Sequence, residues 1–347
     1  MGSSKTLLFS TLLLFITISS SNFSSAQQSF RCSSPGATCN ALIDYVFPNA
    51  TTLAAVATLF TVVNHRSILG ANNLPLSTPT NYPIPAQQTI RIPFPCVCTN
   101  NGTGISDRQP NYTVAPKDGL YHIAAEVFSG LITYQEIAAV NNISDVNSIK
   151  VGQNLWIPLP CSCDDVDGQR VVHYGHMVAH GSTVEAIAAR YNTSEETLLR
   201  LNNLNSSRDL MAGAVLDVPL TTCSSMVNNN SLDYPLLVPN GTYLFTANNC
   251  VMCKCAAAAL LSRPHMLQCE PSPTNSSCPR IRCEGTSKSL FLGDSSTSSG
   301  CNRTTCAYAG YNNQKILTTM VAANFESTCP DEISFFFWNE LARLEAE

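Results

Sequence analysis

The feature that most constrains the fold is a stretch of about fifty residues, Tyr112 to Cys161, which predicts a strand, two helices and a strand. Apolar residues stand at offsets 0, 3, 4, 7 and 8 from Leu120, the spacing of one buried helical face. A second short helix is expected to end at Asn141 and Asn142, and prolines close the strand near Leu155. Because a unit this small buries little apolar surface, we expect its flanking cysteines to stabilise it.

The same pattern occurs three times. The helical spacing recurs from Leu53 and from Val184, and each second helix is followed by an asparagine pair, a residue that tolerates the left-handed end of a helix: Asn72-Asn73, Asn141-Asn142 and Asn202-Asn203. Polar residues two positions before the first apolar residue predict helix N-caps at Thr51, Asp118 and Ser182. The predicted closing strands are Ile90 to Pro93, Leu155 to Pro158 and Leu216 to Pro219. The chain therefore contains three copies of one small module.

The N-terminus predicts secretion. Lys5, an apolar run from Leu7 to Ile18 and the small residues up to Ala26 have the order of a signal peptide covering residues 1–26, with a short core helix as the structural alternative. All sixteen cysteines follow this segment, which indicates disulfides formed in an oxidising compartment. Charged residues make up only 12% of the chain and the net charge is -5, which argues against nucleic-acid binding.

Many glycosylation sequons agree with secretion. The pattern N-x-[ST] marks an acceptor asparagine in a secreted protein. It occurs at Asn49, Asn101, Asn111, Asn142, Asn192, Asn205, Asn229, Asn240, Asn275 and Asn302.

Two C-x-C pairs separate the copies. Cysteines two apart in an extended chain bridge poorly to each other, so each is expected to pair elsewhere. Together with two earlier cysteines they allow three bridges among Cys32, Cys39, Cys96, Cys98, Cys161 and Cys163. A metal site is the alternative, but no histidine stands at ligand spacing beside them.

The repeats resemble the lysin motif (LysM) module, over most of residues 40–222. The resemblance implies an α+β fold, with a two-stranded antiparallel sheet and two helices on one side. It implies LysM modules at residues 40–95 (degenerate), 110–160 and 171–222. It also implies binding of N-acetylglucosamine polymers. The C-x-C pairs resemble those of plant LysM receptor ectodomains, which implies the bridges Cys32–Cys98, Cys39–Cys163 and Cys96–Cys161.

The region after the repeats, residues 223–329, is rich in cysteine and shows no further helical repeat. Its Cys250-x-x-Cys253-x-Cys255 run looks like a zinc or redox motif in isolation, but we expect a disulfide knot. Residues 242–255 and 306–314 resemble the C-terminal region of the plant chitin elicitor-binding protein family. Members of that family carry a GPI anchor and no kinase.

The last residues, 330–347, do not fit a GPI signal. The apolar run from Phe335 to Trp338 is short and is followed by charges, whereas such a signal needs roughly ten to twenty apolar residues. We expect a protein at the extracellular face of the plasma membrane. The family resemblance implies a GPI anchor, but this C-terminus does not support one. No transmembrane helix is expected in the mature chain.

The resemblance also implies binding residues. The family's chitin contacts lie in two loops of the second module, which carry over to Pro116, Lys117, Asp118, Gly119, Leu120, Tyr121 and His122, and to Asp145, Val146, Asn147, Ser148, Ile149, Lys150 and Val151. Some have structural alternatives: a helix N-cap for Asp118, the core for Leu120, simple exposure for Tyr121 and His122, and a loop anchor for Ile149. Glycans at Asn49 and Asn205 would cover the equivalent loops of modules one and three, whereas Asn142 borders the central loop.

The resemblance implies a component of a pattern-recognition receptor that binds chitin oligomers in plant innate immunity. Without a kinase, it would signal through a LysM receptor kinase, and a long oligomer would bridge two copies into a dimer. Recognition of peptidoglycan or of lipochitooligosaccharides is the alternative.

A secreted glycoside hydrolase with LysM anchors is less favoured, because hydrolysis needs two carboxyl groups across a cleft. The acids after the repeats form no paired motif: Asp233, Glu270, Glu284, Asp294, Asp331 and Glu332. We therefore expect no enzyme, no cofactor and no metal.

Overall fold

The structure is a computed structural model that describes residues 30–223, 225–256, 266–274, 277–285, 290–297 and 303–323. The predicted signal peptide, the tail at residues 330–347, and the sequons at Asn275 and Asn302 lie outside the described residues. So do Cys301 and Cys329.

Three successive units have the order strand, helix, helix, strand. Unit 1 contains β1 (Thr38–Val46), β2 (Thr51–Thr52), α1 (Leu53–Leu59), α2 (His65–Ala71), β3 (Pro83–Ile84) and β4 (Thr89–Cys98). Unit 2 contains β6 (Asn111–Thr113), α3 (Leu120–His122), the π-helix η1 (Ile123–Val127), α4 (Tyr134–Val140) and β7 (Asn154–Trp156). Unit 3 contains β9 (Val171–Met177), α5 (Val184–Tyr191), α6 (Glu195–Leu201), η2 (Ser207–Asp209) and β10 (Val215–Thr221). The linkers supply β5 (Gly104–Ser106) and β8 (Pro160–Cys161).

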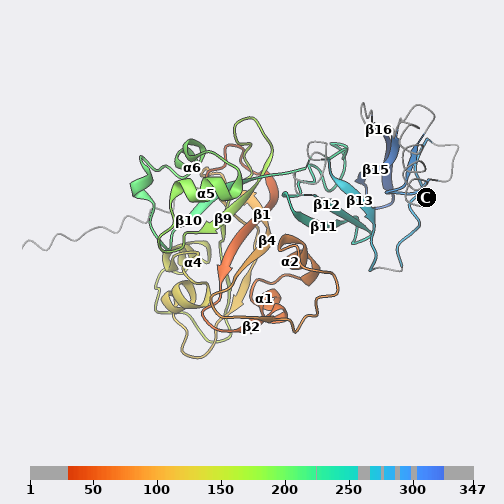
Figure 1. The fold of residues 1–347 in the computed structure, drawn as a ribbon. Coiled ribbons are helices and arrows are strands. Elements are labelled where there is room, and N and C mark those ends of the chain that lie inside the picture. The colour runs from red at the N-terminus through yellow and green to blue at the C-terminus, as the bar shows by residue number, and fades with distance from the viewer. Residues whose placement is uncertain are drawn as a thin grey trace, which may run out of the picture.

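Units 1 and 3 share one sheet, which the repeat pattern did not predict. Its strand order is β10-β9-β1-β4-β5-β8, and Figure 1 shows β10, β9, β1 and β4 side by side. Strand β1 runs parallel to β9, and Ile43 pairs with Gly175. A Cβ atom on Gly175 would lie 3.0 Å from Ile43 and 3.1 Å from Val215, so glycine permits this close approach. The strands β6 and β7 of unit 2 form a separate two-stranded sheet.

The predicted helical faces are buried, which confirms the helix assignments. Leu53, Leu120 and Val184 each begin the first helix of their unit and are at most 2% exposed. Most buried apolar residues of units 1 and 2 form one continuous core, which Val215 of unit 3 joins. Most of those of unit 3 form a second core, which Leu42 and Ala71 of unit 1 join. Within the described ranges, no helix combines the length and the hydrophobicity that crossing a membrane requires.

The predicted helix N-caps are wrong by one residue. Thr52 and Thr183 accept the capping hydrogen bonds, from the amides of Ala55 and Ala186, because the first apolar residue is itself the first helical residue. In unit 2 the cap is Gly119, which has no side chain to accept such a bond. Asp118 is thereby free for a different role, described below.

The asparagine pairs do more than end the second helix. The second member of each pair has a positive φ, between 51° and 54°, as predicted for Asn73, Asn142 and Asn203. The first member joins the helix to the closing strand. The Asn202 amide donates to the carbonyls of Leu198 (2.8 Å) and Asp217 (2.9 Å), and its oxygen accepts from the Asp217 amide (2.7 Å). Asn72 and Asn141 make the same three bonds in units 1 and 2.

Three disulfides link the units and their linkers: Cys32–Cys98, Cys39–Cys163 and Cys96–Cys161. These are the pairings that the family resemblance implies. Cys96 and Cys161 are almost completely buried. Removing a native disulfide from a small secreted domain typically costs about 2–5 kcal/mol.

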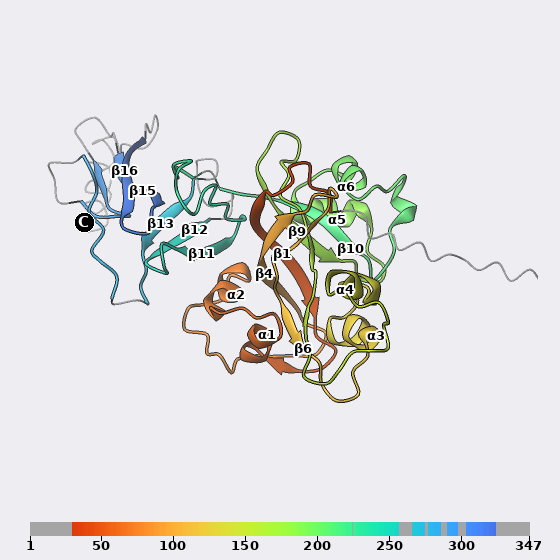
Figure 2. The ribbon, with the colours of Figure 1, turned by 180° about the vertical axis from the view of Figure 1, so that it is seen from behind.

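The described part of the C-terminal region contains two small sheets (Figure 2) and four further disulfides. One sheet contains β11 (Thr242–Thr246), β12 (Val251–Cys255) and β13 (Gln268–Pro271), and the other β14 (Ser295–Thr297), β15 (Arg303–Tyr311) and β16 (Ile316–Ala323). The bridges are Cys223–Cys255, Cys250–Cys278, Cys253–Cys269 and Cys283–Cys306. The predicted disulfide knot around Cys250 is therefore confirmed.

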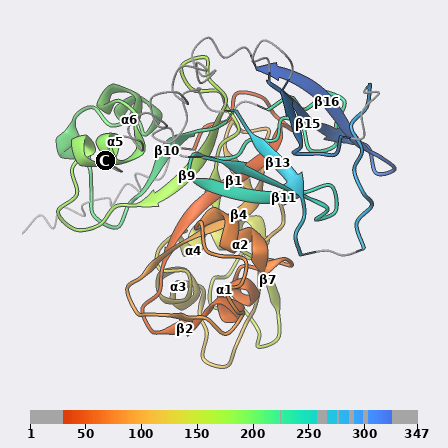
Figure 3. The ribbon, with the colours of Figure 1, turned by 45° about the vertical axis from the view of Figure 1, so that its right-hand side comes forward.

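The C-terminal region docks on helix α2 of unit 1 through β11 (Figure 3). The Tyr243 hydroxyl donates to the Leu74 carbonyl (2.6 Å), and the Asn64 amide donates to Asn249 (2.8 Å). A Cβ atom on Gly70 would lie 2.0 Å from the Tyr243 carbonyl oxygen, a clash with backbone. Glycine in this helix is therefore required by the docked strand.

We predict that Gly70→Ala loosens this docking. The added methyl group has to displace a backbone carbonyl, and overpacking of this kind typically costs about 1–3 kcal/mol. Hydrogen exchange at residues 65–71 and 242–246 is expected to speed up. Gly119→Ala is the matched control, because nothing lies within 4 Å of a Cβ atom there. Equal exchange rates in both variants would contradict the docking.

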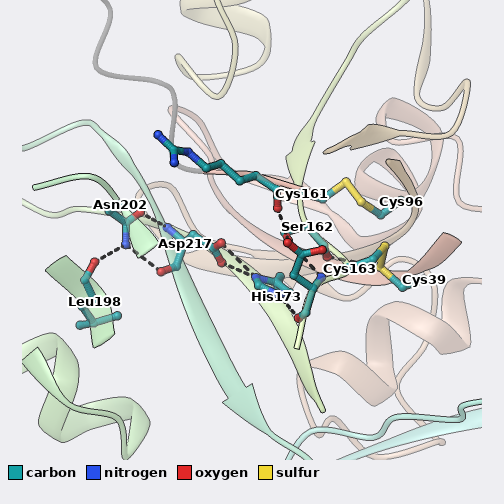
Figure 4. Close-up of polar contacts among 11 residues, drawn as sticks. Cys39, Cys96, Cys161, Ser162, Cys163, His173, Leu198, Asn202 and Asp217 are labelled. Atoms are coloured by element: carbon teal, nitrogen blue, oxygen red, sulfur yellow. Dashed lines mark hydrogen bonds and ion pairs between the residues drawn. A yellow bond between two sulfur atoms is a disulfide. The ribbon is translucent and has the colours of Figure 1, made fainter. Parts of the chain in front are cut away.

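A buried histidine joins unit 3 to the linker that follows Cys163 (Figure 4). His173 Nδ1 lies 2.8 Å from Asp217 Oδ1, and its Nε2 lies 2.8 Å from the Asp164 carbonyl oxygen. Both partners are acceptors, so both ring nitrogens carry a proton and the imidazole is charged. Burial opposes this charge, but the Asp217 carboxylate and the hydrogen bonds outweigh it and raise the pKa of His173 above its ordinary value. The Asp164 carboxylate in turn accepts from Ser33.

Candidate functional site

The two predicted binding loops of unit 2 lie side by side. The Val114 amide donates to the Gln153 carbonyl (2.9 Å), and the Gly152 amide donates to the Val114 carbonyl (2.8 Å). These bonds extend the β6–β7 pairing into the loops. The first loop therefore leaves the sheet directly beside Val151, the last residue of the second predicted segment.

Asp118 organises the first loop. Its carboxylate accepts from the Ala115 amide (2.7 Å) and the Tyr112 hydroxyl (2.8 Å), and it pairs with His122 Nδ1 (2.9 Å). Burial, and next the bond to Asp118, raise the pKa of Tyr112 to about 12. The loop is thus held by its own side chains. Neither the helical spacing nor the helix-cap pattern of the sequence predicts this bond from Asp118 back to the Ala115 amide.

Asp145 organises the second loop. Its carboxylate accepts from the Ser148 hydroxyl (2.6 Å) and the Asn147 amide (3.0 Å). These donors, the hydroxyl first, lower the pKa of Asp145. Further along, the Gln153 side chain accepts from the Lys150 amide (3.0 Å). Both loops therefore present a fixed backbone, which a scaffold that recognises a ligand through backbone groups requires.

The loops expose apolar side chains beside polar ones. Tyr121 is 69% exposed, Val151 is 64% exposed and Val146 is 37% exposed. The other exposed members of the predicted set are Pro116, Lys117, Asp145, Asn147, Ser148 and Lys150, and the half-buried ones are Asp118, Gly119, His122 and Ile149. Leu120 is only 2% exposed, so its side chain belongs to the core, as the helical spacing indicated.

His122 faces a different surface from the second loop. Its Nε2 lies 3.5 Å from Glu126, and it lines a cleft of about 590 Å³ together with Asn49 and Gln87 of unit 1. No residue of the predicted segment 145–151 lines this cleft. His122 therefore stays bonded to Asp118 of the first loop but faces unit 1, on a surface that the second loop does not line.

Unit 2 differs from the others in its first helix. The Phe128 amide donates to the Ile123 carbonyl (2.9 Å), five residues earlier, and η1 is a π-helix, whereas the same position in unit 1 is the α-helix α1. Segments of this kind often occur at functional sites. The apolar spacing from Leu120 did not distinguish the two helix types.

All eight sequon asparagines in the described part of the chain are exposed: Asn49, Asn101, Asn111, Asn142, Asn192, Asn205, Asn229 and Asn240. Two clusters have metal-ligand spacing, Cys39, Cys96 and Cys163, and Cys32, Cys98 and Asp164. Every cysteine in them is in a disulfide and so offers no thiolate, the form of cysteine that binds metals.

The comparisons with known proteins agree with this description. The LysM domain family matches residues 112–158 and 176–219, which are most of units 2 and 3. The chain is therefore a LysM protein with disulfide-linked modules.

Two relatives identify the family. "LysM domain-containing GPI-anchored protein 2" of Arabidopsis thaliana is 44% identical over 328 residues, which cover 93% of this chain and 91% of the relative. "Chitin elicitor-binding protein" of Oryza sativa subsp. japonica is also 44% identical, over 305 residues that cover 86% and 83%. The chain belongs to the family of LysM domain-containing GPI-anchored proteins and chitin elicitor-binding proteins. Among solved structures, the ectodomain of a receptor-like kinase matches 55% of this chain and 93% of its own, with 21% identity and a TM-score of 0.45.

Proposed function

We propose that this protein binds chitin oligomers through the two loops of unit 2. The observation that carries the proposal is the pair of self-braced loops, held together at Val114 and presenting Tyr121 and Val151 to solvent. Chitin is an uncharged chain of acetamido groups, hydroxyls and ring faces. Apolar side chains suit its acetyl methyls and rings, and fixed backbone groups suit its amides. The relative named for chitin elicitor binding supports the same ligand.

In this proposal the other units have a structural role and flank the binding module. Residues 40–95 are a degenerate LysM module, residues 110–160 the binding module and residues 171–222 a third module, followed by the cysteine-rich region 223–329. Glycans on Asn49 and Asn205 would cover the equivalent loops of units 1 and 3. Asn142 is exposed directly after α4, so a glycan there would border the chitin groove.

The proposal places the protein at the extracellular face of the plasma membrane in plant innate immunity, where it catalyses no reaction. A LysM receptor kinase would carry the signal into the cell. A long chitin oligomer would bridge two copies, because linking two binding events raises the effective concentration for the second.

Calorimetric titration of the secreted, glycosylated protein tests the ligand. We expect binding of chitin oligomers, and weaker binding of muropeptides and lipochitooligosaccharides. Preference for muropeptides would overturn the ligand assignment. New reducing ends after incubation with chitin would indicate a hydrolase instead.

A further inference from the structure

The cleft between units 1 and 2 is built from the unit 1 counterparts of the candidate binding loops. In unit 1 the Gln87 amide donates to the Phe47 carbonyl (2.7 Å), as the Gly152 amide donates to Val114 in unit 2. Gln87 has a positive φ of 63°, as Gly152 has one of 85°. This groove therefore has the same backbone arrangement, but the π-helix η1 of unit 2 forms its opposite wall.

The cleft has the size and chemistry of a small carbohydrate site. Its volume of about 590 Å³ lies within the range of about 300–1,000 Å³ for small-ligand pockets. Val46, Pro48 and Val127 provide apolar walls. Gln87 supplies a primary amide, which both donates and accepts hydrogen bonds, and Asn49 supplies the amide to which a sugar can be attached.

The polar groups of the cleft are available to a ligand. In the described part of the chain, the side chains of Asn49 and Gln87 make no hydrogen bond with another protein group. The Glu126 carboxylate is 70% exposed and is paired with His122 at 3.5 Å, which leaves it able to accept from hydroxyl groups. A neutral ligand with amide and hydroxyl groups therefore fits better than an ion.

We propose that this cleft holds two N-acetylglucosamine residues, and that a glycan attached to Asn49 supplies them. Asn49 is the acceptor of the sequon Asn49-Ala50-Thr51, it is exposed, and it lines the cleft, so the first sugars of a glycan there begin inside it. Those sugars are N-acetylglucosamine, the repeating unit of chitin. The attached glycan braces unit 1 against η1 of unit 2.

Attachment forms a bond between Asn49 Nδ2 and C1 of the first sugar. It breaks the bond between that C1 and the pyrophosphate oxygen of a lipid-linked oligosaccharide donor, and one amide proton is released. The bracing itself is noncovalent.

The test is the rate at which a peptide N-glycosidase releases each glycan from the folded protein, followed by mass spectrometry. We expect release from Asn49 to be at least tenfold slower than release from Asn101, an exposed turn residue, and the two rates to become equal after denaturation. Ala125→Trp, which fills the cleft, should raise the rate at Asn49 and leave that at Asn101 unchanged.

A second arm distinguishes the source of the sugar. Asn49→Gln protein is titrated with N,N′-diacetylchitobiose while hydrogen exchange is followed at residues 125–129, most of which line the cleft and all of which lie outside both candidate loops. Protection that Ala125→Trp abolishes would support an N-acetylglucosamine site in the cleft. Together with slow release from Asn49 it supports the attached glycan as the source, whereas together with fast release from Asn49, or no glycan there, it would overturn that source and leave free sugar. Fast release from Asn49, or no glycan there, together with no protection by chitobiose would overturn the site. Neither arm depends on chitin binding by the loops of unit 2.

Discussion

Replacing His173 by leucine is expected to lower the free energy of unfolding by about 3–5 kcal/mol at pH 6. The substitution leaves the Asp217 carboxylate, 1% exposed, without its charged partner and leaves the Asp164 carbonyl without its donor. The linker that follows Cys163 also loses its hydrogen bond from β9. Urea titration with the disulfides intact measures the effect.

The cost of His173→Leu should also fall as the pH rises. Because the pKa of His173 in the folded protein is raised above its value of about 6.5 in the unfolded chain, its stabilisation is complete below about pH 6.5. It is lost as the pH rises through the folded-state pKa. The difference between wild type and variant should therefore shrink toward alkaline pH. His180→Leu, at an exposed histidine of the same unit, is the control. A difference that does not change with pH would show that His173 is not held as a cation.

Replacing Asn202 by aspartate is the second change with a large expected effect. Aspartate cannot donate to the carbonyls of Leu198 and Asp217, and it places a negative charge beside both oxygens. Leaving such buried groups unsatisfied costs about 1–3 kcal/mol each, so we expect a loss of about 2–4 kcal/mol.

The matched control is Asn154→Asp. The Asn154 side chain is exposed and accepts from the Thr113 hydroxyl (2.7 Å), a bond that aspartate can also accept. Its stability should change by less than about 0.5 kcal/mol. If both variants unfold at the same denaturant concentration as the wild type, the asparagine does not hold helix and strand together.

Much of the local structure follows from the sequence because it depends on short-range patterns. The spacing from Leu53, Leu120 and Val184 depends on helix geometry alone. The asparagine pairs end their helices because asparagine tolerates the positive φ of the second residue after the helix. The predicted N-caps were off by one residue because more than one residue that can cap a helix precedes each first helix. The three-dimensional structure decides which side-chain oxygen accepts a hydrogen bond from an amide of the first turn.

The contacts between units could not be predicted in the same way. The parallel pairing of Ile43 with Gly175 joins residues far apart in the chain, and a repeat pattern does not specify how copies associate. The docking at Gly70 also depends on a distant strand. For the site, family resemblance placed the two loops, but it could not show that His122 faces unit 1 or that Asp118 braces its own loop.

The most direct test of the central claim is calorimetric titration of a chitin octamer into the Val151→Asp protein. Val151 is exposed beside both loops, whereas Ile149 is half-buried against the core and its replacement would also disturb folding. Val63→Asp is the matched control, because Val63 is 95% exposed and lies in unit 1. We predict at least a tenfold loss of affinity, about 1.4 kcal/mol, for Val151→Asp and no loss for Val63→Asp. Equal affinities of both folded variants and the wild type would contradict a chitin site at the loops of unit 2.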